Sequence, residues 1–362
     1  MEITRELPEP FRTLVAASEV PSSDRQQYVA PLREFLTAMS IEDPNRHAAL
    51  SLVCETMEFN FSQSKSLADA DANVQANREL LALLQSQKSA DVDALSQAFH
   101  NLSVALSGRH QLPENRHQAA DLDEAITNGR IAVSVASGCG NPELPLYQSQ
   151  LGKLLTTRSE SSKASACEDI EEAVSVLHNA TTAASEANDG LGSLYDRYGS
   201  ALQAKYELLG DPGDLDKAIE AHKEAAQQAV DENAKGGCLS NLANARLRRF
   251  DHNGSVDYEE VDQALKESER AVNLTSKTYY DYPGRLVNLS NVLQVRFERG
   301  GNDRDSYLYR AVQASRDAVG AAKVIHTGRL EHAECLANLG TTLTRLFELT
   351  KSTPHIDDAL KA

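Results

Sequence analysis

Hydrophobic and small residues recur along the chain with an almost constant period. After each acidic or polar turn an alanine is followed by an aliphatic residue, and successive pairs lie 45 to 48 residues apart. The six pairs are Ala125-Ile126, Ala173-Val174, Ala218-Ile219, Ala264-Leu265, Ala311-Val312 and Ala359-Leu360. A fixed period of this size indicates one supersecondary unit copied along a solenoid.

A first helix in each period is marked by an apolar residue followed by a small one. These pairs are Leu102-Ser103, Leu151-Gly152, Tyr198-Gly199, Leu242-Ala243, Leu289-Ser290 and Leu339-Gly340. In five of the six copies another apolar residue lies four positions before the small one, and Gln148 is the exception. This spacing predicts one buried helical stripe, on which the small residue lets a neighbouring helix approach closely.

A second helix follows, with another alanine seven residues after the first. The pairs are Ala125/Ala132, Ala173/Ala180, Ala218/Ala225, Ala264/Ala271 and Ala311/Ala318. Seven residues make about two helical turns, so both alanines are expected at one tight helix crossing. Asp121 with Glu124 has the form of an acidic capping box, and Gly210 and Pro212 break the chain before another acidic start at Asp214.

Composition limits the classes of partner. The formal charge of −17 and the pI near 5.0 argue against binding to a phosphate backbone, which needs concentrated Lys and Arg. No apolar run approaches the roughly 20 residues that span a bilayer, and the N-terminus lacks a signal peptide. We therefore expect no nucleic-acid partner, no membrane partner and a cytoplasmic or nuclear location. An acidic surface favours solubility and basic partners.

Neither a cofactor nor a catalytic site is indicated. The sequence has no Gly-rich phosphate loop, no His-Glu-x-x-His and no Gly-x-Ser-x-Gly, and His326 and His332 fall on different faces of a helix. The cysteines form no Cys-x-x-Cys pair, so we expect reduced packing residues. They are Cys54, Cys139, Cys167, Cys238 and Cys335. The sequence predicts no cofactor, no metal and no enzyme activity.

The two-helix unit resembles the tetratricopeptide repeat, with its apolar-small pair on the first helix and two small residues seven apart on the second. The resemblance covers residues 91–362 and implies an all-α fold, a right-handed α-solenoid of antiparallel helix pairs with about six to seven repeats of about 47 residues. The family period is about 34 residues. We expect the extra length mainly between the two helices, at segments such as 159–166 and 251–259. Arg246 occupies a core slot that is Leu in the other copies, with Leu247 as the expected substitute.

Two copies carry a more particular motif, Asn-Leu-small-Asn followed by Arg-Phe, at residues 241–250 and 288–297. It is similar to the long repeats of large fungal and bacterial proteins, which often continue into a caspase-like protease domain. No segment here matches such a domain. The sequence ends only a few residues into a sixth second helix, so we expect a fragment or a truncated gene product.

The first ninety residues are less regular. Residues 1–45 are predicted to form an N-terminal helical cap, and 46–90 a degenerate first repeat. Residues 91–362 would then form the repeat array, with the last repeat truncated. Helical stripes run through 48–57 and 74–84, and terminal repeats are expected to be atypical because one face meets water.

The resemblance implies that first helices line a concave groove and that the residue after each small position points into it. The groove residues that we predict to bind a peptide are Lys153, Gln203, Asn244, Arg248, Asn291, Gln294 and Arg345. Asn and Gln can bond the main chain of an extended peptide through both donor and acceptor groups. Alternatively, these side chains are only solvated or bond the neighbouring helix.

A basic residue also recurs near the end of each first helix, where cations suit the helix dipole and can pair with the acidic start of the second helix. The residues are Arg109, Arg158, Lys205, Arg249 and Arg296, with Arg345 shifted by one. We favour this structural role over ligand contact. The sequence as a whole predicts a non-catalytic protein-interaction scaffold that binds a protein or peptide in its groove. The alternatives are the regulatory arm of a larger caspase-like protease and, less favoured, an enzyme with a cryptic site.

Overall fold

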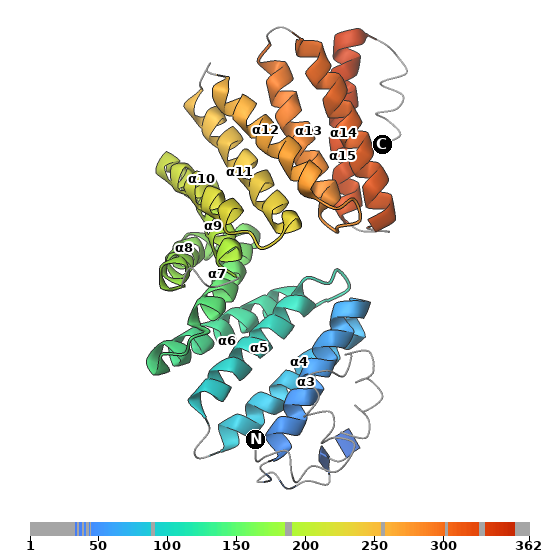
Figure 1. The fold of residues 1–362 in the computed structure, drawn as a ribbon. Helices are drawn as coiled ribbons and strands as arrows, with labels where there is room; N and C mark the ends of the chain where they lie inside the picture. The colour runs from blue at the N-terminus through green and yellow to red at the C-terminus, as the bar shows by residue number, and fades with distance from the viewer. Residues whose placement is uncertain are drawn as a thin grey trace. The chain divides into compact units, whose positions relative to one another are not determined.

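The computed structural model describes residues 33–34, 36–37, 40, 43, 45–87, 91–184, 190–254, 258–300, 303–325 and 330–351, which are helical almost throughout (Figure 1). The helices are α3 (Asn45–Ser64), α4 (Leu67–Ser86), α5 (Val92–His110), α6 (Gln118–Cys139), α7 (Leu144–Ser161), α8 (Ala166–Ala183), α9 (Leu191–Leu209), α10 (Pro212–Gln227), α11 (Glu232–Asn253), α12 (Glu259–Leu274), α13 (Tyr282–Glu298), α14 (Arg304–Ile325) and α15 (Leu330–Thr350). These residues contain no strand, and none of their helices is both long and apolar enough to cross a membrane.

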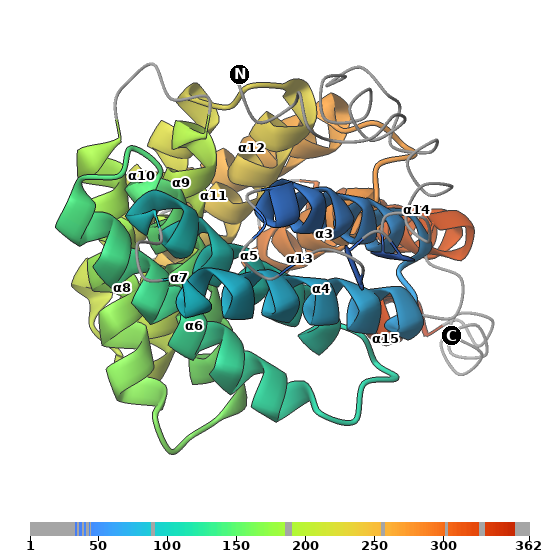
Figure 2. The ribbon, with the colours of Figure 1, turned by 90° about the horizontal axis from the view of Figure 1, so that it is seen from below.

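The chain divides into two compact units, Met1–Ser162 and Lys163–Ala362. In unit 1, α3 lies beside α4 (Figure 2), α5 packs on α6, and α4 and α6 each contact the helix that follows. The predicted stripes at 48–57 and 74–84 lie in α3 and α4. Most of the predicted N-terminal cap lies outside the described residues.

Unit 2 repeats one packing rule from α8 to α15. Each helix packs on the next, and the first helices α9, α11, α13 and α15 also contact one another in order (Figure 1). The predicted all-α class and the tandem stacking of helix pairs are therefore confirmed. The predicted pair Ala359-Leu360 lies outside the described residues.

The alanine crossings are confirmed. All ten alanines of the second helices have 0% of their surface exposed. The small residue of the first helix lies against this seam, because the buried Ser103 hydroxyl donates to the carbonyl oxygen of Ala125 at 2.7 Å. A larger side chain at any of these positions would separate two backbones.

Gly199 marks a close approach between a first and a second helix. A Cβ on this residue would lie 2.7 Å from the Cε1 and Nε2 atoms of His222, a ring that is fully buried on α10. Real Cβ atoms do not come so close to a ring. Position 199 therefore requires glycine, because the His222 ring fills the space that a side chain would occupy.

The capping box predicted at Asp121 and Glu124 is wrong. Helix α6 begins earlier, at Gln118, and its preceding residue makes no side-chain cap. Asp121 instead accepts hydrogen bonds from Arg109, and Glu124 accepts from Arg78 on α4. Both acids at this helix start instead form bidentate pairs with arginines on neighbouring helices, and such pairs add geometric specificity as well as free energy.

Helix α10 starts where the sequence predicts a break. Gly210 adopts a left-handed φ of 78° at the end of α9, and Pro212 is the first residue of α10. The Asp211 side chain accepts from the backbone N–H of Gly213 at 2.9 Å. Proline suits this position because its missing N–H would have no helical partner.

The extra length of each repeat lies largely in the helices, which corrects the expectation of inserted loops. Residues 159–161 extend α7, and 251–253 extend α11. Helices α5 to α15 run for 16 to 22 residues. Long helices allow more side chains from each pair to meet the next pair.

Arg246 occupies its core position as one partner of an ion pair. Arg246 is buried on α11, and its Nε lies 3.0 Å from a Glu267 carboxylate oxygen on α12. The expected substitute Leu247 is also buried and packs with Phe250 and Val292. The two adjacent residues thus divide the role that leucine has in the other copies.

Candidate functional site

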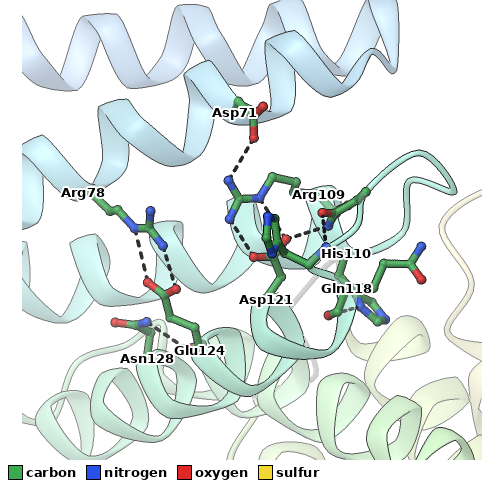
Figure 3. A network of polar contacts seen from close by, with 10 residues as sticks. Asp71, Arg78, Arg109, His110, Gln118, Asp121, Glu124 and Asn128 are labelled. Carbon is green, nitrogen blue, oxygen red and sulfur yellow. Dashed lines mark hydrogen bonds and ion pairs between the residues drawn. The ribbon is translucent and has the colours of Figure 1, made fainter.

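Cations at the ends of the first helices join neighbouring second helices. Arg109 lies between Asp121 of its own repeat, at 2.6 Å, and Asp71 of the preceding helix α4, at 2.9 Å (Figure 3). Hydrogen bonding to Asp121 raises the pKa of Arg109. Burial alone would raise the pKa of Asp121, but the bonds from Arg109 and Asn115 outweigh it, so the pKa of this carboxyl is lowered.

The same arrangement recurs in the later repeats. Three second helices, α6, α10 and α12, begin with two acids two residues apart, of which the first pairs with the cation of its own repeat and the second with the cation of the next. The observed pairs are Asp121–Arg109, Asp214–Lys205 and Glu260–Arg249 within a repeat, and Asp123–Arg158, Asp216–Arg249 and Asp262–Arg296 between repeats. The predicted pairing with acidic turns is confirmed for these cations. Arg345 differs, because it pairs with Glu298 on the preceding first helix.

A cleft of about 580 Å³ opens against the first helices of unit 2. Its walls come from the N-terminal halves of α9, α11, α13 and α15 and from the loops before α11 and α13. We call it the unit 2 cleft. The lining residues on which the argument depends are Ser193, Asp196, Asn241, Asp281, Arg285 and Glu334.

Side-chain hydrogen bonds connect the first helices along the cleft. Asn241 on α11 donates from Nδ2 to both carboxylate oxygens of Asp196 on α9, at 3.0 and 3.2 Å. His222 lies with its Nδ1 2.9 Å from the same carboxylate. In the next repeat, Asn288 donates to Ser240 at 2.8 Å. These bonds fix the polar groups that face the cleft.

The carboxylate of Asp196 stays charged because of these bonds. Burial would raise its pKa, but the hydrogen bonds from His222 and Asn241 and the charge of Arg197 together lower it. A carboxylate bonded in this way has little freedom to turn. It therefore presents a fixed negative charge at the cleft wall.

Arg285 is a buried cation in the opposite wall. Only 3% of its side chain is exposed; its Nε donates to Asp281 at 3.3 Å, and its Nη1 donates to Thr275. The Nη2 group donates to no described residue and lies beside Gly237, because a Cβ on that glycine would be 3.2 Å from it. Gly237 and Arg285 both line the cleft, so an N–H donor of Arg285 lies at its wall with no acceptor among the described residues.

Three of the predicted groove residues lie further along the helices that form the cleft. Gln203 donates to the backbone oxygen of Asn241 at 3.3 Å, and Asn244 makes no side-chain hydrogen bond within the described residues. Asn291 is exposed and accepts from Asn338 at 2.7 Å. None of these three residues lines the cleft.

The remaining four predicted groove residues have separate surroundings. Lys153 lines a cavity of about 240 Å³ in unit 1. In unit 2, Arg248 is exposed and pairs with Glu207, Gln294 is buried and donates to Ser290, and Arg345 lines a hollow of about 460 Å³. The structure therefore does not gather the seven residues in one site, and their part in binding stays a prediction.

The sequence contained a signal for part of the cleft. Asn241 and Asn288 are the first asparagines of the Asn-Leu-small-Asn motif, whereas our prediction used the second, Asn244 and Asn291. The tyrosines and Asp281 of the loop before α13 carry no period, and nothing in the pattern indicated them. Arg285 was equally hidden, since an arginine on a helix is usually exposed.

Asn244→Ala is expected to change the free energy of unfolding by less than about 0.5 kcal/mol, because its side chain has no partner to lose. Asn241→Ala should cost about 1.5 kcal/mol, because it removes two bonds to a charged acceptor. Urea unfolding followed by circular dichroism measures both. Equal losses in the two variants would contradict the assigned contacts.

The cysteines are all free; Cys54, Cys238 and Cys335 are buried, whereas Cys139 and Cys167 are exposed. Burial raises the pKa of the Cys54 and Cys238 thiols to about 12. Both thiols are therefore protonated at neutral pH and poor nucleophiles. Within the described residues, no group of three His, Cys, Asp or Glu side chains is placed to hold a metal ion.

No protein-family model and no curated protein matches this sequence. Among solved structures, BtubC from P. vanneervenii aligns at 15% identity and a TM-score of 0.49, covering 70% of this chain and 89% of that one. A signal-transduction ATPase with a tetratricopeptide repeat sensor from Pyrococcus horikoshii aligns at 11% identity and a TM-score of 0.48, covering 96% and 52%. Human IFIT1, a dimer with m7Gppp-AAAA, aligns at 13% identity and a TM-score of 0.46, covering 99% and 77%.

These likenesses concern the arrangement of helices alone, at identities of 11 to 15%. The helix pairs of the structure itself carry the tetratricopeptide-like description. The predicted relation to caspase-like proteases stays a prediction.

Proposed function

We propose that this chain is a non-catalytic interaction module that holds an extended polypeptide segment in the unit 2 cleft. The observation that carries the proposal is the cleft itself, a hollow of about 580 Å³ that crosses four successive first helices. Its volume lies within the roughly 300 to 1,000 Å³ that is typical of ligand sites. Its walls come from several repeats, so an elongated ligand can contact each in turn.

The polar groups of the cleft suit a polypeptide main chain. Arg285 offers an N–H donor from a buried position, and Asn288 carries an amide with both a donor and an acceptor. An extended segment presents alternating C=O and N–H groups that such side chains can bond. The exposed side chains of Val230 and Tyr280 add apolar surface for the segment's own side chains.

The predicted groove residues extend this surface in the proposal. Asn244 lies three residues after Asn241 on α11, and Asn291 lies three residues after Asn288 on α13. Residues three apart are neighbours on one helix face. A segment longer than the cleft would therefore pass from the first asparagine of each motif to the second.

Filling the cleft tests the proposal. Ser193 is exposed on α9 and lines the cleft, so Ser193→Trp places a large side chain in it without disturbing the core. Twelve-residue peptides are first selected on the wild-type protein from a random phage-displayed library, and their dissociation constants are measured by fluorescence anisotropy. We expect Ser193→Trp to weaken the selected peptides at least tenfold.

The matched control is Gln263→Trp, which adds the same side chain at an exposed position on the second helix α12, outside the cleft. It should leave affinity within about twofold. Thermal unfolding of both variants checks that they remain folded. A library without enriched peptides, or enriched peptides that bind Ser193→Trp as tightly as the wild type, would overturn the proposal.

A further inference from the structure

Negative groups predominate in the walls of the unit 2 cleft. Its described lining residues include the carboxylates of Asp196, Asp281 and Glu334, and Arg285 is the one Lys or Arg among them. Arg285 is already bonded to Asp281. Glu334 is exposed on α15 and makes no ion pair within the described residues. Carboxylates therefore outnumber cations among the lining residues by three to one, in keeping with the charge of −17 of the whole chain.

Aromatic rings lie next to these carboxylates. The rings of Tyr279 and Tyr280 are 4.7 Å apart, and 65% of Tyr280 is exposed. Both tyrosines precede Asp281 in the loop before α13 and line the cleft. Tyrosine faces attract the ammonium and guanidinium groups of ligands. The Tyr279 ring already receives the guanidinium of Arg285, at 5.2 Å.

The N–H donor that Arg285 presents at the cleft wall distinguishes a polypeptide from a simple cation. The Nη2 group belongs to a buried side chain, lies beside Gly237 and has no acceptor among the described residues. A polypeptide supplies a main-chain carbonyl to this group and can carry a positive side chain at the same time. A free amine or a metal ion supplies no such acceptor.

We infer that the unit 2 cleft selects a basic polypeptide segment, with a main-chain carbonyl on Arg285 and a lysine or arginine side chain between the cleft carboxylates and Tyr280. This inference rests on the proposed function and adds the chemistry of the partner. Salt screens charges over about 8 Å at physiological ionic strength, so the affinity should fall as salt rises.

Three fluorescein-labelled twelve-residue peptides test the inference: alternating Lys-Ser, Gln-Ser and Glu-Ser. Fluorescence anisotropy at 50 and 300 mM NaCl gives their dissociation constants. We expect Lys-Ser to bind at least tenfold more tightly than Gln-Ser at the lower salt, Glu-Ser to bind more weakly still, and Ser193→Trp to weaken Lys-Ser at least tenfold.

A matched pair of charge variants separates the cleft from the general acidity of the surface. Glu334→Gln and Glu348→Gln each remove one exposed carboxylate from α15, and only Glu334 lines the unit 2 cleft. We expect Glu334→Gln to weaken Lys-Ser about fivefold and Glu348→Gln to change it less than twofold. Equal effects of the two substitutions would mean that the peptide senses only net charge, which overturns the inference.

The library peptides distinguish this inference from the proposed function. The first possible result is that Ser193→Trp weakens binding of the library peptides, but the peptides carry no excess of lysine or arginine and bind Glu334→Gln with wild-type affinity. In that case the basic-segment inference fails and the proposed function stands. If neither library nor synthetic peptides respond to Ser193→Trp, both fail. Enrichment of lysine and arginine together with sensitivity to Glu334→Gln supports both.

Discussion

Asp121→Asn is expected to lower the free energy of unfolding by about 3 kcal/mol, because it leaves the mostly buried Arg109 without its principal counter-charge. Only 3% of the Asp121 side chain is exposed, and both of its oxygens accept from Arg109. Its second partner, Asn115, is also buried and donates at 2.7 Å. Chemical unfolding of unit 1, monitored by circular dichroism, measures the loss.

The contribution of Asp121 also depends on pH. Its folded-state pKa is lowered, so the unfolded chain binds a proton more readily than the folded chain does. The stabilisation is fully present above the unfolded value of about 3.9 and disappears as pH falls through the lower folded value. The difference in unfolding free energy between wild type and Asp121→Asn should therefore be constant from about pH 7 to 5 and shrink below about pH 4.

Asp71→Asn is the control for this prediction. Asp71 binds the same Arg109 at 2.9 Å, but 57% of its side chain is exposed. Exposed ion pairs contribute about 0 to 1 kcal/mol, so this variant should remain close to wild type. A loss as large as that of Asp121→Asn would show that burial does not decide the strength of the two ion pairs of Arg109.

Ala225→Leu is expected to destabilise unit 2 by about 1 to 3 kcal/mol through overpacking. Ala225 is completely buried in a cluster with Leu202, Leu239 and Leu242. The additional carbons must displace one of the neighbouring helices, because the interior is close-packed. Thermal and urea unfolding measure the effect.

Ala337→Leu serves for comparison, since Ala337 is exposed on α15 and leucine is a good helix former. It should change stability by less than about 0.5 kcal/mol. If Ala225→Leu proved equally neutral, the helix crossing described for α10 would be wrong.

The period and the small residues were enough to predict the helix pairs. Ala218 and Ala225 lie seven apart because two helical turns separate their contacts, so the crossing was visible in the sequence. The helix starts were harder to predict. The same carboxyl can cap its own helix or bind a cation on another, and only the packed structure shows that Asp121 does the second.

The depth of the cleft was not predictable for a related reason. The motif indicated which face of α11 is polar, but not whether Asn241 or Asn244 lies deeper. That depends on His222, which reaches Asp196 from another helix, and on the loop that carries Tyr280. Side chains that are brought together from four helices leave no local pattern in the sequence.

The paired acids at the helix starts bear on how such an array can change its length. Asp214 and Asp216 are spaced like Glu260 and Asp262, and in each pair the second acid binds the cation of the following repeat. Duplication or loss of one whole copy would therefore join a second acid to a cation of the same kind. The chain could grow or shorten by a full period in a single genetic event, and a junction between copies of this kind would still have its counter-ion.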